Sequence, residues 1–372
     1  MNTYSARARV RVDSPAGLLA TIPHLLGFTP ADSLVVLGVT SEGRVPGAFR
    51  YDLPDPPDAT TAAEIAGHAL GVLVRQNLPV AVVAGYGPGT RVTPLADAFR
   101  AAAPTSGVRL HDVLRVEDGR YWSYLCTNPA CCAAEGVVFD PAADPASRAL
   151  TAAGLGVLAS REALAATIGP VTGADADAMR QATAQAERAA DLLIARKGPD
   201  ALIRPGLAVV RASIRLYREG RSIVPLIGYA WLALTLRQLQ IRDDAWARMD
   251  PLHQVSHLRL WTDVVRHAQP GYIAAPASLL AFTAWQGGDG ALANLALDRA
   301  LADQPDYSLA LLLRDVLDAG TPPTLATPPM TPEEVAESYT TSGQSPARRE
   351  ESSPASQPRP GENEAPGETA AT

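Results

Sequence analysis

The chain has little of several residue types that mark common protein classes. Its 372 positions include three cysteines, a single lysine (Lys197) and 5% aromatic residues. Three cysteines, an odd number gathered in one segment, do not form the disulfide framework of a secreted domain. No apolar run reaches the roughly 18 residues of a membrane span, and no secretory signal follows Met1. We therefore expect a cytoplasmic protein with no membrane partner.

Positive charge is also scarce. The net charge is −7 at pH 7. Nucleic-acid binding by phosphate neutralisation requires a basic face, so we expect no nucleic-acid partner. The length and the hydrophobic content of 47% suit about two globular domains.

Residues 1–142 predict an α/β domain, because period-two and apolar strand patterns alternate with helical ones. Ser14 and Pro15 indicate a helix start, and Gly27 indicates its end. A turn at Glu117–Gly119 predicts a hairpin, which makes the partly parallel sheet mixed. The expected strands are Arg7–Val12, Ser33–Val39, Val45–Leu53, Val80–Tyr86, Val108–Val116 and Tyr121–Leu125, with further helices at Thr60–Arg75 and Pro94–Ala103.

Residues 143–321 predict an all-α domain, in which short connections favour antiparallel neighbours. One stretch has the spacing of a tetratricopeptide helix pair, although an ordinary helical bundle explains it equally well. Its residues are Ala281, Ala284, Trp285, Gly288, Ala293, Leu297, Ala300, Leu301 and Pro305. The expected helices are Glu162–Ile168, Ala174–Arg196, Gly206–Glu219, Val224–Leu239, Ala245–His267, Ala277–Gln286, Ala291–Asp303 and Ser308–Ala319.

Residues 322–372 are rich in Pro, Ser, Thr, Glu and Gly. This composition offers almost nothing to bury, so the sequence predicts a disordered tail.

The most informative segment is Arg120–Cys132, RYWSYLCTNPACC, which holds all three cysteines. Together with Pro23–Leu34, PHLLGFTPADSL, it resembles the domain-of-unknown-function family 4192 (DUF4192). The resemblance extends from about Val10 to about Pro323. The family usually has Pro directly after the paired cysteines, where this chain has Ala133, so the following turn is expected to differ. The resemblance implies no reaction, substrate or catalytic residue.

The three thiols have three alternative roles. They can bind zinc or copper, with His111 or Asp112 completing a four-ligand zinc site. They can form a redox pair, with Cys126 opposing Cys131 or Cys132. They can also pack as small apolar side chains at the end of a hairpin. The sequence favours packing, because adjacent cysteines tend to diverge, so we expect no bound metal and identify no cofactor.

Residues of the Pro23–Ser33 segment form a second candidate. His24, Asp32 and Ser33 are the types of a base, an orienting group and a nucleophile. However, Ser33 enters a strand instead of a strand-to-helix elbow. Turn and capping roles explain these residues better, although the loop is also a candidate ligand surface beside Arg120, Trp122 and Cys126.

Three weaker motifs occur elsewhere. His253 and His257 have a chelating spacing, but Gln254 stands where a metalloprotease has Glu, so surface or capping roles are favoured. Gly85–Gly89 follows a strand, where either a phosphate-binding turn or a flexible turn is expected. Arg211, Arg215 and Arg218 share a helical face, which is solvated or contacts an acidic partner.

We therefore expect a non-enzymatic binding, regulatory or scaffolding protein whose helical domain contacts a protein partner. The alternative is an enzyme, or a metal or redox protein, with its site between the Pro23–Ser33 loop and the Arg120–Cys132 segment. Cys131 and Cys132 belong to that candidate surface.

Overall fold

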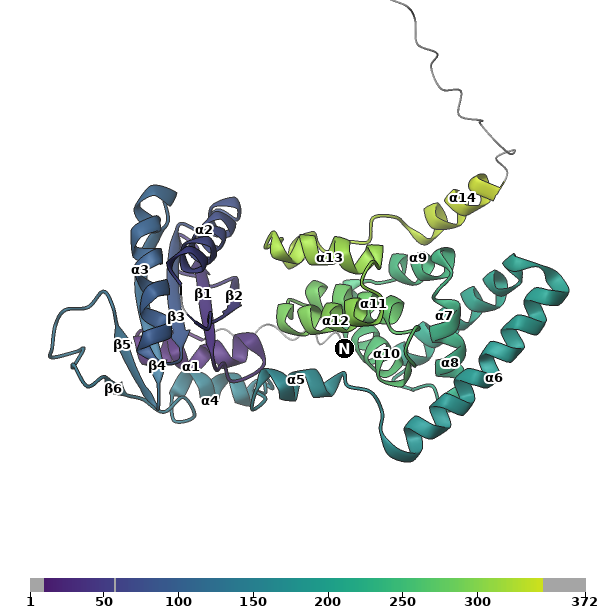
Figure 1. The fold of residues 1–372 in the computed structure, drawn as a ribbon, viewed down its shortest axis with the longest axis horizontal. Coiled ribbons are helices and arrows are strands. Elements are labelled where there is room, and N and C mark those ends of the chain that lie inside the picture. The colour runs from purple at the N-terminus through teal and green to yellow at the C-terminus, as the bar shows by residue number, and fades with distance from the viewer. Residues whose placement is uncertain (1–9, 57, 344–372) are drawn as a thin grey trace, which may run out of the picture.

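The computed structural model describes residues 10–56 and 58–343, which form an α/β part followed by a helical part (Figure 1). A six-stranded sheet has the order β2-β1-β3-β4-β5-β6. Its β3–β4 pair is parallel and the other pairs are antiparallel. The expected mixed sheet is confirmed. The strands are β1 (Ser33–Val39), β2 (Gly47–Asp52), β3 (Val80–Tyr86), β4 (Arg109–Glu117), β5 (Arg120–Ser123) and β6 (Val137–Val138).

Strand β1 is apolar along its length because both faces of the sheet are covered. Leu34 and Val36 belong to one apolar cluster, whereas Val35 and Leu37 belong to another. Successive side chains of a strand point to opposite faces, so a strand buried on both sides lacks polar alternation.

Helices α2 (Ala59–Arg75) and α3 (Gly89–Ser106) cover one face of the sheet, where Leu70 and Phe99 are fully buried. Helix α1 (Pro15–Leu26) covers the other face. The Ser14 hydroxyl accepts a hydrogen bond from the Gly17 N–H at 3.1 Å, and Gly27 ends the helix with φ +77°. The two predicted ends of α1 are therefore confirmed, since only glycine adopts this φ without strain.

The second half of the chain is helical, as expected, and none of the six strands extends into it. The helices expected over Ala277–Gln286 and Ala291–Asp303 are present as α11 (Ala274–Gln286) and α12 (Gly290–Asp303), which pack on one another, and Ala284, Ala293 and Ala300 are buried. The helices of the helical part are α5 (Arg161–Thr167), α6 (Gly173–Lys197), α7 (Ile203–Arg218), α8 (Leu226–Thr235), α9 (Leu239–Ala247), α10 (Gln254–His267), α11 (Ala274–Gln286), α12 (Gly290–Asp303), α13 (Ser308–Asp318) and α14 (Pro332–Gly343).

The single helix predicted over Ala245–His267 is wrong, because α9 ends at Ala247 and α10 begins at Gln254. Pro251 opens a short 3-10 turn between them. Asp250 caps this turn, since its carboxylate accepts the backbone N–H of His253 at 3.0 Å. A proline preceded by a capping aspartate ends one helix and starts the next.

The sheet, and not the boundary between the halves, separates the two cores. One cluster lies between the sheet and α2–α3. The other starts under α1, with Ile22 and Phe28, and continues through Leu164 and Ile168 into the helical part. Helix α4 (Pro145–Ala152), which follows the expected boundary at residue 142, packs on α1. The two halves therefore share one apolar cluster and do not each have a separate core.

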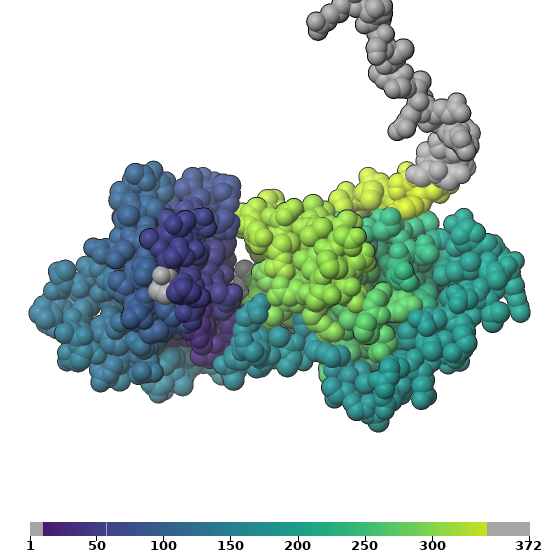
Figure 2. All heavy atoms as spheres, in the orientation of Figure 1, coloured from purple at the N-terminus to yellow at the C-terminus, as the bar shows by residue number. Residues whose placement is uncertain are grey.

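A second set of contacts joins the two halves where α13 meets α2, as the continuous surface in Figure 2 shows. His68 contacts the carbonyl oxygen of Asp318 at 3.0 Å, and Arg75 donates to that of Ala319 at 3.3 Å. Gly320 packs so closely on Val72 that a Cβ there would lie 2.3 Å from the Val72 side chain. The α/β and helical parts thus contact one another at two places.

The predicted disorder from residue 322 onward is wrong for 322–343. Thr331 and Glu334 form a capping box that starts α14. Val335 is buried, and the Tyr339 hydroxyl donates to Asp243 at 2.7 Å, so α14 is anchored on α9. Residues 344–372 lie outside the described part.

The predicted first strand, Arg7–Val12, is not observed where it can be checked. Residues 7–9 lie outside the described part, and 10–12 belong to no strand. Val12 instead contacts the start of α1, where it lies beside Gly17. Among the described residues, no helix is long and apolar enough to cross a membrane.

Candidate functional site

The three cysteines lie on the loop between β5 and β6, which projects from the edge of the molecule remote from the helical part (Figure 1). We call residues 124–136 the thiol loop. The loop connects β5 and β6, which are the last two strands in the sheet order, so the sheet lies on only one side of the loop.

Ser123 anchors the start of the thiol loop. Its hydroxyl accepts the backbone N–H groups of Leu125 at 3.1 Å and Cys126 at 2.9 Å, and donates to the carboxylate of Asp112 at 2.6 Å. Asp112, which the sequence suggested as a metal ligand, therefore fixes Ser123 instead. A hydroxyl with three such partners has a single orientation, so Cys126 leaves the sheet in a defined direction.

Asn128 shapes the middle of the loop. Its side-chain oxygen accepts the Ala130 N–H at 2.9 Å, and its carbonyl accepts the N–H groups of Cys131 and Cys132 at 3.2 and 2.9 Å. This Asn–Pro turn, with Pro129 at its second position, brings the cysteine pair back towards Cys126. The Asn128–Pro129 dipeptide is the sequence signal for this turn.

Arg120 and Trp122 hold the returning end of the loop. Arg120 donates to the carbonyl of Gly136 at 3.1 Å, and the Trp122 indole N–H donates to that of Ala134 at 3.0 Å. Gly136 lies against the indole ring with φ +82°, and a Cβ there would lie 2.5 Å from it. Arg115 stacks on Trp122, with its guanidinium carbon 3.8 Å from a ring centroid. Both predicted residues thus position the thiol loop.

The three sulfur atoms form a compact cluster. All lie within 4.8 Å of one another, and those of Cys126 and Cys131 are 3.2 Å apart. They are free thiols; Cys131 is exposed, and Cys126 and Cys132 are partly exposed. The favoured expectation of buried, apolar packing is therefore wrong. A loop at the sheet edge has no second layer to cover it.

The contacts within the cluster separate the acidities of the thiols. Hydrogen bonds from Cys132 and Cys131 lower the pKa of Cys126, because they stabilise its thiolate. The contact with Cys126 raises the pKa of Cys131 and raises that of Cys132 to about 12. Cys126 is thus the thiol that ionises first, and the other two act as donors to it.

His24 does not face the thiol loop. It is 8% exposed and joins α1 to α4, with Nδ1 2.8 Å from the Leu155 carbonyl oxygen and Nε2 2.9 Å from the Ser147 hydroxyl. Because a carbonyl only accepts, Nδ1 carries the proton and Nε2 accepts from Ser147. The expected capping role at the helix end is replaced by this link between helices.

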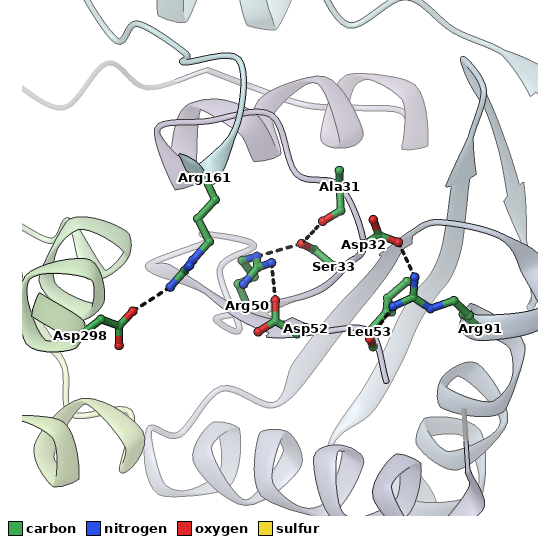
Figure 3. Close-up of polar contacts among 9 residues, drawn as sticks. All are labelled: Ala31, Asp32, Ser33, Arg50, Asp52, Leu53, Arg91, Arg161 and Asp298. Atoms are coloured by element: carbon green, nitrogen blue, oxygen red, sulfur yellow. Dashed lines mark hydrogen bonds and ion pairs between the residues drawn. The ribbon is translucent and has the colours of Figure 1, made fainter. Parts of the chain in front are cut away.

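Ser33 and Asp32 hold the turn into β1 (Figure 3). The buried Ser33 hydroxyl donates to the Ala31 carbonyl at 2.6 Å and accepts from Arg50 at 2.8 Å. Asp32 pairs with Arg91 at 2.5 Å. The predicted turn role of Ser33 is confirmed, and these partners leave neither His24 nor Ser33 arranged as a base and its nucleophile.

The two segments of the alternative hypothesis do not converge. Ser33 begins β1, whereas the thiol loop follows β5, and β3 and β4 lie between them. Three strand spacings correspond to about 14 Å. Cys126 is also joined through the Ser123 hydroxyl to Asp112, in the middle of β4. Ser33, in contrast, pairs with Tyr86 of β3, which pairs with Val116 near the end of β4. The structure therefore does not bring Ser33 and the thiols together.

Two weaker motifs have structural roles. At the Gly85–Gly89 turn, the Arg115 guanidinium fills the space next to Gly89, where a Cβ would overlap it. His253 contacts the Asp250 carboxylate at 3.0 Å, which agrees with a cap. His257 is buried, so the expectation of a surface histidine is wrong for it.

Ser123→Ala tests the anchoring of the thiol loop. The N–H groups of Leu125 and Cys126 would lose their acceptor, so we expect faster amide exchange there and faster reaction of the thiols with a disulfide reagent. The global free energy of unfolding should fall by about 1 kcal/mol. Thr127→Ala, an exposed neighbour, is the control. Equal thiol reactivity in both variants would show that Ser123 does not order the loop.

Fold and site together define a protein with a mixed-sheet α/β part, a helical part and an exposed three-thiol loop. The chain belongs to the family described as Domain of unknown function (DUF4192), which matches residues 15–324. The resemblance seen in the two sequence motifs is thereby confirmed. The match covers both parts of the fold, which shows that they belong to one family unit. No curated protein and no solved structure matches the chain.

Proposed function

We propose that this protein is a non-enzymatic metal-binding protein that holds a thiophilic ion, Zn²⁺ or Cu⁺, on Cys126, Cys131 and Cys132. The observation that carries the proposal is the clustering of three sulfur atoms within 4.8 Å on one loop. Thiolates select these soft ions over Mg²⁺ or Ca²⁺. This replaces our expectation from sequence that no metal is bound.

The geometry supports three sulfur ligands on one ion. Sulfurs bound to Zn²⁺ at about 2.3 Å in a tetrahedron lie about 3.8 Å apart. The distances in the cluster bracket this value, from 3.2 Å between Cys126 and Cys131 to the 4.8 Å limit. Small side-chain rotations are therefore sufficient. Neither His111 nor Asp112 belongs to the cluster among the described residues, so the fourth zinc position is left to water or to a partner, whereas Cu⁺ is satisfied by three thiolates.

The metal test uses the full chain, reduced and stripped of metal. Titration with Zn²⁺ against a chromophoric chelator should give about one equivalent with the wild type. Cys126→Ser and Cys131→Ser should each lose this uptake while retaining the far-ultraviolet circular dichroism of the fold. Thr127→Ala should bind like the wild type. Uptake by the wild type equal to that of Cys126→Ser would exclude the site.

The pH dependence of the metal affinity shows how many of the thiols are ligands. Cys131 and Cys132 have raised pKa values, so both must release protons when metal binds. Apparent affinity should therefore rise about 100-fold or more per unit between about pH 6 and 8. A rise below about tenfold per unit would mean that fewer than two of these thiols are ligands.

A further inference from the structure

A groove on the helical part gathers arginines at a place remote from the thiol loop. It has a volume of about 580 Å³ and lies between α7, the end of α9 and the start of α14. Four arginines line it, together with Ile214, Ala247 and Pro332: they are Arg211, Arg215, Arg218 and Arg248. We call it the arginine groove. Its volume lies within the range of small-ligand sites.

Three of these guanidinium groups are held in place by carboxylates. Asp244 is 2% exposed and accepts from Arg211 at 2.7 Å and from both Nε and Nη2 of Arg248 at 2.7 and 2.9 Å. Arg218 donates to Asp250 at 2.5 Å. Arginine has five N–H donors, and among the described residues no hydrogen bond of these three arginines uses Nη1. Each therefore keeps donors free while its position is fixed.

Arg215 is the arginine of the groove without such a tether. It is exposed, and no hydrogen bond or ion pair engages it among the described residues. Charges at the groove do not cancel, because its four arginines meet three carboxylates: Glu219 and Asp250 in the wall, and Asp244 beneath it. Glu219 is also 3.5 Å from Arg221. The wall thus has an excess of positive charge in a protein of net charge −7.

Glu333, in the first turn of α14, opposes this charge. It is exposed and acts on Arg211 electrostatically. Since Glu334 forms the capping box, Glu333 is free to be replaced without removing the cap. A ligand in the groove would compete with its carboxylate.

We propose that the arginine groove binds a phosphate monoester, carried by a small molecule or by a phosphorylated peptide. Prepositioned guanidinium groups recognise phosphate through several charge-assisted hydrogen bonds at once. A phosphate monoester offers three acceptor oxygens to the free donors of these guanidinium groups, whereas a carboxylate offers two. The apolar patch formed by Ile214, Ala247 and Pro332 accommodates the carbon part of the ester. The site is independent of the metal proposal.

Isothermal titration of the full chain with O-phosphoserine tests the proposal, using two variants with effects of opposite sign. Arg215→Gln should weaken binding about tenfold, since a charge-assisted bond is lost. Glu333→Gln should tighten binding about two- to threefold, because a competing carboxylate is removed. Arg204→Gln, an exposed arginine of the same helix outside the groove, should leave binding unchanged.

Three results would overturn the proposal: no binding of O-phosphoserine to the wild type at millimolar concentration, equal loss in the Arg204 and Arg215 variants, or equal binding of succinate. A short peptide containing phosphoserine separates the two sources of the ligand. Tighter binding of the peptide than of O-phosphoserine assigns the groove to a phosphorylated partner. Equal binding assigns it to a small molecule, and both outcomes support phosphate recognition.

Discussion

Phe28→Ala should lower the free energy of unfolding by about 3–5 kcal/mol, because the removed ring leaves a cavity in a packed core. Phe28 is 1% exposed and follows α1, where its backbone pairs with Leu158. It belongs to the apolar cluster that continues into the helical part. Phe28→Ala should therefore destabilise both halves.

Tryptophan fluorescence can test this coupling, because four of the five tryptophans lie in the helical part: Trp231, Trp246, Trp261 and Trp285. In urea, Phe28→Ala should shift the fluorescence transition together with the far-ultraviolet transition. Leu25→Ala, in the last turn of α1 but 44% exposed, should cost less than about 1 kcal/mol. An unshifted fluorescence transition in Phe28→Ala would show that the two halves unfold independently.

His257 should make the protein lose about 3 kcal/mol of stability between pH 6.5 and pH 4. Burial, followed by the nearby charge of Arg218, lowers the pKa of His257 to about 4 from its ordinary value of 6.5. Its Nε2 lies 3.4 Å from the Arg218 guanidinium, and its Nδ1 has no partner among the described residues. The environment thus favours the neutral ring.

The direction of this change of stability with pH follows from proton uptake by the unfolded chain. Between pH 6.5 and about 4 the unfolded chain protonates His257 and the folded chain does not, so acid favours unfolding. The stability is complete above pH 6.5 and declines down to about pH 4. The lowered pKa values of Asp244 and Asp250 act below their ordinary value of 3.8, so they do not obscure this interval.

Urea unfolding at pH 8 and pH 5 measures the effect. His257→Gln has a packing cost that is the same at both pH values, so the difference between them isolates the titration. The variant should lose less stability than the wild type on going from pH 8 to pH 5. An identical loss in the two proteins would contradict a neutral, buried His257.

Local signals predicted the α/β elements well. The bounds of β1 and β3 agree with the predicted strands at both ends, since short apolar runs flanked by turn residues have few alternatives. Local signals also misled where two of them competed. The pattern of Ala245–His267 predicts one helix, but Asp250 and Pro251 interrupt it. The polar composition after Pro322 predicts disorder, but Thr331 and Glu334 start a helix there.

The candidate site was predicted in part. The cysteine segment was identified as the most informative one, and Arg120 and Trp122 do shape it. Their positioning role required the contacts with Ala134 and Gly136, which are 12 and 16 residues away along the chain. His24 and Ser33 were grouped because they are close in sequence, but each has partners on a different element.

The sequence by itself determined strands β1 to β5 and the helices that cover the sheet, because strand and helix periodicities and end signals are local. It also determined the family. Only the tertiary structure decided which surfaces these elements share. It placed three thiols together at an uncovered sheet edge, extended one core across both halves, and docked α14 beside four arginines. Such contacts join residues far apart in the chain, and no local pattern records them.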